Sequence, residues 1–155
     1  MVTRKQQGFT IIEVVLVLAI AGLIFLMVFI ALPALQRGQR DTQRRNDVAR
    51  FASQVTQYQA NNKGNVPATF ADNTAANKFI TNYMNNEWQD PSGVSYAFVQ
   101  AATATDALTG LTTAGQWTYA QGKVCVGETM TDGGTRNYVI AMKLEGAGIF
   151  CKDNK

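Results

Sequence analysis

The sequence predicts an α+β protein in which a long, apolar N-terminal helix forms a spine and a small antiparallel β-sheet forms a head packed against it. Three observations carry this prediction. An apolar run near the N-terminus contains a single charge, helical periodicity continues beyond that run, and short alternating segments with turn residues fill the second half. Of the 155 residues, about a hundred remain for a soluble part, which suits one small domain.

The apolar run comes first. Residues 9–35 hold one charged side chain, that of Glu13, and the uninterrupted part, residues 14–36, is 23 residues long. A helix of that length crosses a hydrocarbon layer of about 30 Å. The sequence therefore predicts a membrane-spanning helix half over residues 9–36.

The run is preceded by a recognisable motif. Residues 5–13 read Lys-Gln-Gln-Gly-Phe-Thr-Ile-Ile-Glu. This pattern resembles the class III signal of type IV pilins and pseudopilins. The resemblance implies that prepilin peptidase, a membrane-embedded aspartyl peptidase, removes residues 1–8 as a leader by cutting between Gly8 and Phe9, and then N-methylates Phe9.

The charge inside the apolar run needs a partner. An ionised carboxylate in a transmembrane helix costs a few kcal/mol and usually has a function. The cut would create a cation, the α-amine of Phe9, able to meet Glu13 of a neighbouring copy. The resemblance implies that this pairing sets subunit register, with Phe9, Thr10 and Glu13 as the assembly residues.

The resemblance also implies partners and a location. The precursor would sit in the cytoplasmic membrane as a single-pass protein, and an inner-membrane assembly platform with its ATPase would move it into an extracellular pilus at the cell surface. There it would form a homopolymer.

Two alternative interpretations of the N-terminus are a secretory signal and a single-pass membrane anchor. A secretory signal would have a shorter apolar region, of about 7 to 15 residues, and no glutamate within it. A plain single-pass anchor is also possible, and positive-inside counting would then place the C-terminal part in the cytoplasm. The residues behind that count are Arg37, Arg40, Arg44 and Arg45. The signal pattern and the paired cysteines favour export.

The helical pattern continues over residues 37–62 and ends near Asn61, where Asn, Gly and Pro follow. Its apolar stripe, spaced by three and four residues, predicts a face packed under a sheet. The stripe consists of Val48, Phe51, Ala52, Val55 and Tyr58. The mixed charges of residues 37–45 predict a solvated, salt-bridged collar where the helix leaves the bilayer. A lipid head-group or nucleic-acid patch is the alternative.

The helix has a weak portion. Pro33 has no amide hydrogen and crowds the carbonyl of Phe29, so the helix is expected to bend or loosen there. Gly22 and Gly38 extend the weakness. The resemblance implies that helicity is lost between Gly22 and Gly38 when subunits pack into filaments.

The remaining residues, 63–155, are predicted to form the globular head with its antiparallel sheet. A short helix is expected over residues 74–86 and a turn over residues 90–93. Strands joined by antiparallel hairpins are expected at residues 94–101, 116–121, 123–126, 137–145 and 148–151. In residues 137–145, one apolar face is expected to lie on the helical stripe. That face comprises Tyr138, Ile140, Met142 and Leu144.

The two cysteines, Cys125 and Cys151, lie in predicted strands, and in an exported protein they favour one disulfide. Such a bridge is worth about 3 to 4 kcal/mol on the loop-entropy model. The resemblance implies a similarly placed C-terminal disulfide loop. No His is present, so a zinc site is improbable. A turn at residues 131–134 suggests calcium, but it offers too few oxygen ligands.

Composition argues against an enzyme, and no cofactor is implied. The chain has no His to act as a general base, and the acidic residues are scattered. The net charge of +3 includes Arg4 and Lys5 of the leader, so no global electrostatic partner is indicated.

The sequence thus predicts a type IV pilus subunit. Pseudopilins of secretion or competence systems share the N-terminal half and stay open as the alternative. A third possibility is a DNA-binding minor pilin, suggested by basic residues close to aromatic ones. These are Lys78, Lys123 and Arg136, with Tyr83, Trp117 and Tyr138.

Overall fold

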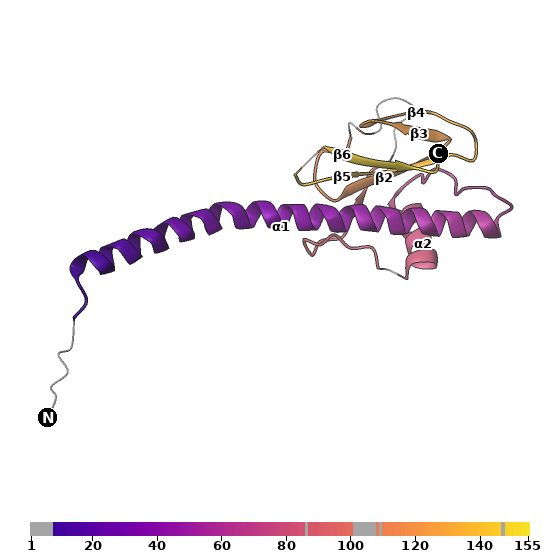
Figure 1. Cartoon of the computed structure of the whole chain (residues 1–155). Helices are drawn as coiled ribbons and strands as arrows, with labels where there is room; N and C mark the ends of the chain where they lie inside the picture. The colour runs from indigo at the N-terminus through magenta and orange to yellow at the C-terminus, as the bar shows by residue number, and fades with distance from the viewer. Residues whose placement is uncertain (1–7, 86, 101–107, 109, 147) are drawn as a thin grey trace. The chain divides into compact units, whose positions relative to one another are not determined.

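The computed structural model describes residues 8–85, 87–100, 108, 110–146 and 148–155. The predicted leader, residues 1–8, lies outside the described residues except for Gly8. The chain forms two compact units, Met1–Gln36 and Arg37–Lys155. One helix, α1 (Ile11–Asn61), contributes to both units (Figure 1).

In the first unit, α1 is a helix whose apolar side chains are exposed. An 18-residue stretch of it is long and apolar enough to cross a membrane, and none of that stretch is buried within the protein. The helix is unbroken through Pro33. By length and composition, this part of α1 could therefore form the predicted membrane span.

In the second unit, α1 carries the predicted apolar stripe. Val48, Phe51, Ala52 and Val55 are buried, and Tyr58 packs against them as a partly buried side chain. The helix ends where it was predicted to end. Lys63 and Gly64 take positive φ angles of 56° and 80°, which reverses the chain direction.

The second helix, α2 (Asn73–Met84), begins and ends on capping residues. The side chain of Asp72 accepts a hydrogen bond from the Ala75 N–H at 2.8 Å, and Asn85 adopts the left-handed conformation that closes the helix. Its buried face consists of Ala76, Phe79, Ile80 and Met84. Figure 1 shows α2 and the sheet on opposite sides of the C-terminal half of α1.

The main sheet has four strands in the order β1-β2-β5-β6. Their bounds are β1 (Ala97–Phe98), β2 (Gln116–Gln121), β5 (Tyr138–Lys143) and β6 (Ile149–Asp153). The β2–β5 and β5–β6 pairs are antiparallel, as predicted. The prediction was wrong for β1, which has only two residues and runs parallel to β2. The connection over residues 99–115 is long enough for a crossover, so no hairpin is needed there.

A separate hairpin consists of β3 (Lys123–Val126) and β4 (Thr129–Asp132). The strand at β3 was predicted, but β4 was missed, and the predicted turn at residues 131–134 was wrong because Thr131 and Asp132 belong to that strand. The chain turns earlier, where Gly127 has a φ of 62°. A glycine in the left-handed region suits such a two-residue turn.

Both faces of the sheet are covered. Tyr138, Ile140 and Met142 face α1 in a large aromatic-rich core, which confirms three residues of the predicted face. The fourth, Leu144, lies beyond the end of β5 and outside this core. Val139 and Ala141 were expected on the opposite face, and that face is buried too. It packs in a second, smaller core with Leu108, Leu111, Ala120 and Met130.

Candidate functional site

The residues that flank the predicted cut lie just before α1. Gly8, Phe9 and Thr10 are not helical, and α1 begins at Ile11. The side chain of Phe9 is 90% exposed. The bond between Gly8 and Phe9 therefore lies in non-helical backbone, where the internal hydrogen bonds of a helix do not occupy its amide groups.

Thr10 and Glu13 together cap the helix. The Glu13 N–H donates to the Thr10 hydroxyl at 3.4 Å, and the Glu13 carboxylate accepts the N–H and the hydroxyl of Thr10, each at 2.8 Å. This reciprocal arrangement is a capping box, and its Thr-x-x-Glu spacing was readable in the sequence. The capping box gives the Glu13 carboxylate two hydrogen-bond donors from its own chain.

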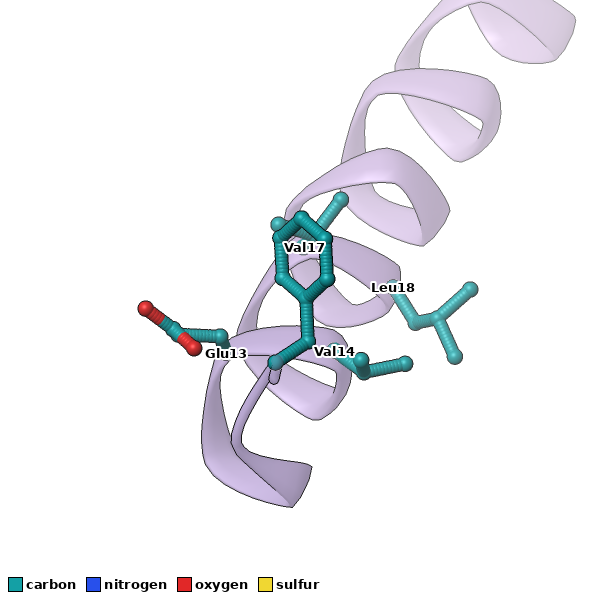
Figure 2. Close-up of a pocket in the computed structure, with 5 residues that line it drawn as sticks. Glu13, Val14, Val17 and Leu18 are labelled. Atoms are coloured by element: carbon teal, nitrogen blue, oxygen red, sulfur yellow. The ribbon is translucent and has the colours of Figure 1, made fainter. Parts of the chain in front are cut away.

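The surroundings of Glu13 are apolar. Phe9, Glu13, Val14, Val17 and Leu18 line an open hollow of about 320 Å³. Figure 2 shows the Glu13 carboxylate projecting outward, away from the side of the helix that carries Leu18. Residues 9–36 contain no Lys or Arg. The apolar run itself therefore offers Glu13 no basic side chain.

Gly22, Pro33 and Gly38 all lie within α1. A Cβ atom added at Gly22 or Gly38 would meet no atom within 4 Å, so close packing inside the subunit does not require glycine there. The loss of helicity suggested for residues 22–38 remains a prediction.

A cluster of charged side chains lies at the N-terminal end of the second unit. Arg44 is only 2% exposed. Its guanidinium binds Asp90 through two hydrogen bonds, with Nε to Oδ2 at 2.6 Å and Nη2 to Oδ1 at 2.8 Å. Its Nη1 reaches Asp41 at 2.9 Å and Glu145 at 3.3 Å. We refer to Asp41, Arg44, Asp90 and Glu145 as the arginine cluster.

Two further arginines of α1 pair with Glu145. Arg40 forms a two-pronged contact with Glu145 at 2.6 and 2.8 Å, and Arg37 approaches it to 3.8 Å. Arg45 instead lies over the ring of Phe150, 5.0 Å from its centroid. The predicted salt bridges are thus present in the basic segment of α1, but the expectation of a solvated collar was wrong for Arg44, which is buried.

The cluster shifts the titration of its carboxyl groups. Burial by itself raises the pKa of Asp41 and of Asp90, but hydrogen bonds outweigh burial and leave both values below the ordinary range. The donors are the N–H groups of Glu145 and Gly146 for Asp41, and Arg44 with Ser92 for Asp90. The hydrogen bond from Arg40 lowers the pKa of Glu145 to about 2.

Sequence reasoning missed this cluster. The mixed charges of residues 37–45 indicated ion pairs, but Asp90 and Glu145 lie far from α1 in the sequence, and nothing local marks them as partners of Arg44. Asp90 falls in the predicted turn, where Asp is common for a different reason.

The structure joins Cys125 of β3 to Cys151 of β6 in a disulfide, with their Cα atoms 6.0 Å apart. The predicted pairing is confirmed. Because β3 and β6 belong to different sheets, the bridge ties the hairpin to the main sheet.

The structure does not support the pairing of basic and aromatic residues that suggested a DNA-binding minor pilin. Trp117 and Tyr138 are buried in the core and offer no face on which a base can stack. Lys123 forms an ion pair with Asp132.

The suggested calcium turn contains Asp132, which is occupied by this ion pair. Among the described residues, no group of three or more His, Cys, Asp or Glu side chains is arranged to hold a metal ion.

Residues 3–29 match the family model of the prokaryotic N-terminal methylation motif, which is the class III signal of type IV pilins. Comparisons with curated proteins and with solved structures give no match. The motif indicates a precursor of the type IV pilin or pseudopilin type. The α+β architecture, with its long apolar helix and small sheet, is consistent with the pilin fold. The family that carries this motif is structural rather than enzymatic.

Proposed function

We propose that this chain is a structural subunit of a type IV pilus, which polymerises through its N-terminal helix into an extracellular filament. The filament would serve adhesion, twitching motility or DNA uptake. The observation that carries the proposal is the class III signal followed by an exposed apolar helix, in which residues 9–36 supply no Lys or Arg to pair with Glu13.

Maturation would proceed in a defined order. Prepilin peptidase cuts between Gly8 and Phe9 and methylates the new amine of Phe9. The apolar helix holds the subunit in the membrane until the assembly platform and its ATPase extract it. In the fibre, the Phe9 amine of one copy pairs with the Glu13 carboxylate of the next, while Thr10 keeps that carboxylate oriented.

The C-terminal disulfide resembles that of many surface pilins, whereas pseudopilins more often lack cysteines, and this favours a surface pilin. Electron microscopy of sheared surface material separates the two. Abundant long filaments made of this chain are expected of a major pilin, whereas a pseudopilin would leave none on the cell surface.

The decisive test is the N-terminus of the mature chain. Mass spectrometry of intact fibres should find N-methylated Phe9 followed by Thr-Ile-Ile, and the eight leader residues should be absent. An uncut Met1, or a cut near Leu35, would contradict the proposal.

A further inference from the structure

We propose that Asp41 and Arg44 act as a clamp that stops the unwinding of α1, so that the helix loosens only N-terminal to this point. This inference rests on the proposed function, because unwinding matters when subunits pack into a filament. It concerns the boundary between the loosened part and the head, and it depends on contacts within the second unit.

Before the clamp, α1 has little to hold it. Residues 14–36 are apolar and exposed, so within the subunit they gain nothing from tertiary packing. Pro33 removes one hydrogen bond of the helix, and Gly38 costs about 1 kcal/mol relative to alanine. Helicity in this part therefore depends on its surroundings.

From Asp41 onward, within one turn of the helix, α1 is held by hydrogen bonds to the head. Oδ1 and Oδ2 of Asp41 accept the N–H groups of Glu145 and Gly146, both at 2.8 Å. These donors belong to the chain just after β5, more than a hundred positions away in sequence. Unwinding α1 through Asp41 would pull the carboxylate away and leave two backbone donors without their partner.

Arg44 adds a second tie, to a different segment. Its two bonds to Asp90 are almost entirely buried, with side-chain exposures of 2% and 1%. Moving Arg44 would leave a buried carboxylate unpaired, which is far less favourable than breaking a surface pair. One turn of helix is thus fixed to two separate parts of the head.

The backbone around the cluster leaves no spare room. A Cβ atom at Gly115, whose φ is 82°, would lie 2.8 Å from Oδ2 of Asp90, and one at Gly146 would lie 3.2 Å from Oδ2 of Asp41. Glycine at these positions lets the main chain approach both carboxylates. The contacts are therefore part of how the head packs, unlike those of mobile surface charges.

The experiment measures amide hydrogen exchange, by mass spectrometry of fragments, on assembled fibres and on the full chain in detergent micelles. In fibres, protection should rise steeply between Gly38 and Asp41; in micelles, where detergent shields the apolar helix, the quantity compared between variants is the exchange of residues 41–47. The Asp41→Asn variant keeps only one acceptor oxygen, so amides of residues 41–47 should exchange about tenfold faster in it. The Glu87→Gln variant is the matched control. It removes only the exposed ion pair between Glu87 and Arg50, and Arg50 lies in the same half of α1 as Asp41 and Arg44.

A second, milder variant keeps the test valid if Asp41→Asn fails to fold. Glu145→Gln leaves both main-chain bonds to Asp41 in place and weakens the pairs of Glu145 with Arg37, Arg40 and Arg44, so a smaller increase of about threefold is expected. Protection that rises gradually across residues 36–48, or variants that exchange like the wild type, would overturn the clamp. Failure to form fibres would contradict the pilus function, while the micelle measurement would still decide the clamp.

Discussion

Arg44 brings a full positive charge into the head, and its three carboxylate neighbours make that burial tolerable. A buried ion pair is not in itself strong evidence for stability, because desolvation offsets much of the attraction. Removing one partner is different, since the charge that remains has no water to replace it. The loss of Asp90 or Arg44 alone is therefore expected to cost several kcal/mol.

Acid should destabilise the head through these carboxylates. The folded pKa values of Asp41, Asp90 and Glu145 are lowered, so their stabilisation is present above the ordinary carboxyl pKa and is lost as the pH falls through the folded value, about 2 for Glu145. The midpoint of thermal unfolding should fall once the pH drops below about 4.

Asp47 has the opposite effect on the pH dependence of stability. Burial raises its pKa despite the hydrogen bond from Tyr96, so its protonation in acid relieves a cost of folding. Glu145→Gln should show a shallower fall in the unfolding midpoint than the wild type. A Glu145→Gln midpoint that follows the same pH course as the wild type would show that Glu145 contributes no pH dependence, whatever the opposing effect of Asp47.

Single residues differ in how far the sequence reveals them. Thr10 and Glu13 are three positions apart, so their capping box follows from local spacing alone. Asp90 and Glu145 meet Arg44 only because the head folds, and a charge in a turn has many more common roles. Long-range ion pairs therefore escaped prediction, whereas the local cap could have been predicted.

At the scale of elements, the helices were the most predictable. α1 shows two clear signals, an apolar run and then a stripe, and its end coincides with a cluster of Asn and Gly. The strands β2 and β3 were also predicted with their observed bounds. β1 and β4 were not, because a two-residue parallel strand has no periodicity and β4 is rich in polar residues.

The disulfide should matter most for the hairpin of β3 and β4. Replacing Cys125 and Cys151 together with serine should lower the free energy of unfolding by about 3 kcal/mol, because the loop it closes becomes free in the unfolded chain. Urea unfolding of the full chain in detergent measures this. Val126→Ser, at an exposed position of the same strand, is the control and should change it by less than about 0.5 kcal/mol.

Hydrogen exchange would locate the effect. In the double serine variant, amides of β3 and β4 should lose protection before those of β5, which has neighbours on both edges. Equal stability with and without the disulfide would mean that the second core holds the hairpin without the covalent tie.

At the scale of the whole molecule, the two units have different tasks in the proposed filament. The first unit supplies the apolar helix and the acid that subunits would share, and the second supplies a folded head with its own core. The sequence indicated this division because the two halves have unlike compositions. It could not indicate how copies pack, since that depends on surfaces of several chains at once.

Changing Glu13 tests assembly directly. Glu13→Ala should leave membrane insertion and cleavage intact but reduce the yield of sheared fibres at least about tenfold, since a carboxylate with a charged partner inside an apolar bundle cannot be replaced by water. Mass spectrometry of membranes and of sheared material measures both quantities.

Glu13→Gln separates charge from capping. Glutamine can still accept hydrogen bonds from Thr10 in a capping box, but it carries no charge for an amine. If pairing drives assembly, both variants should fail; if capping alone matters, glutamine should restore the fibres. Normal fibre yield from both would refute any role of Glu13 in assembly.

The aromatic core has a practical consequence. Both tryptophans of the chain, Trp88 and Trp117, lie in the head, with ring centroids 5.3 and 5.1 Å from that of Phe51 on α1. The indole emission of the protein therefore reports on the packing of the head around these two side chains. Residues 9–36 contain no Trp or Tyr, so fluorescence can follow the opening of the head in vesicles, in detergent and in fibres on one common scale.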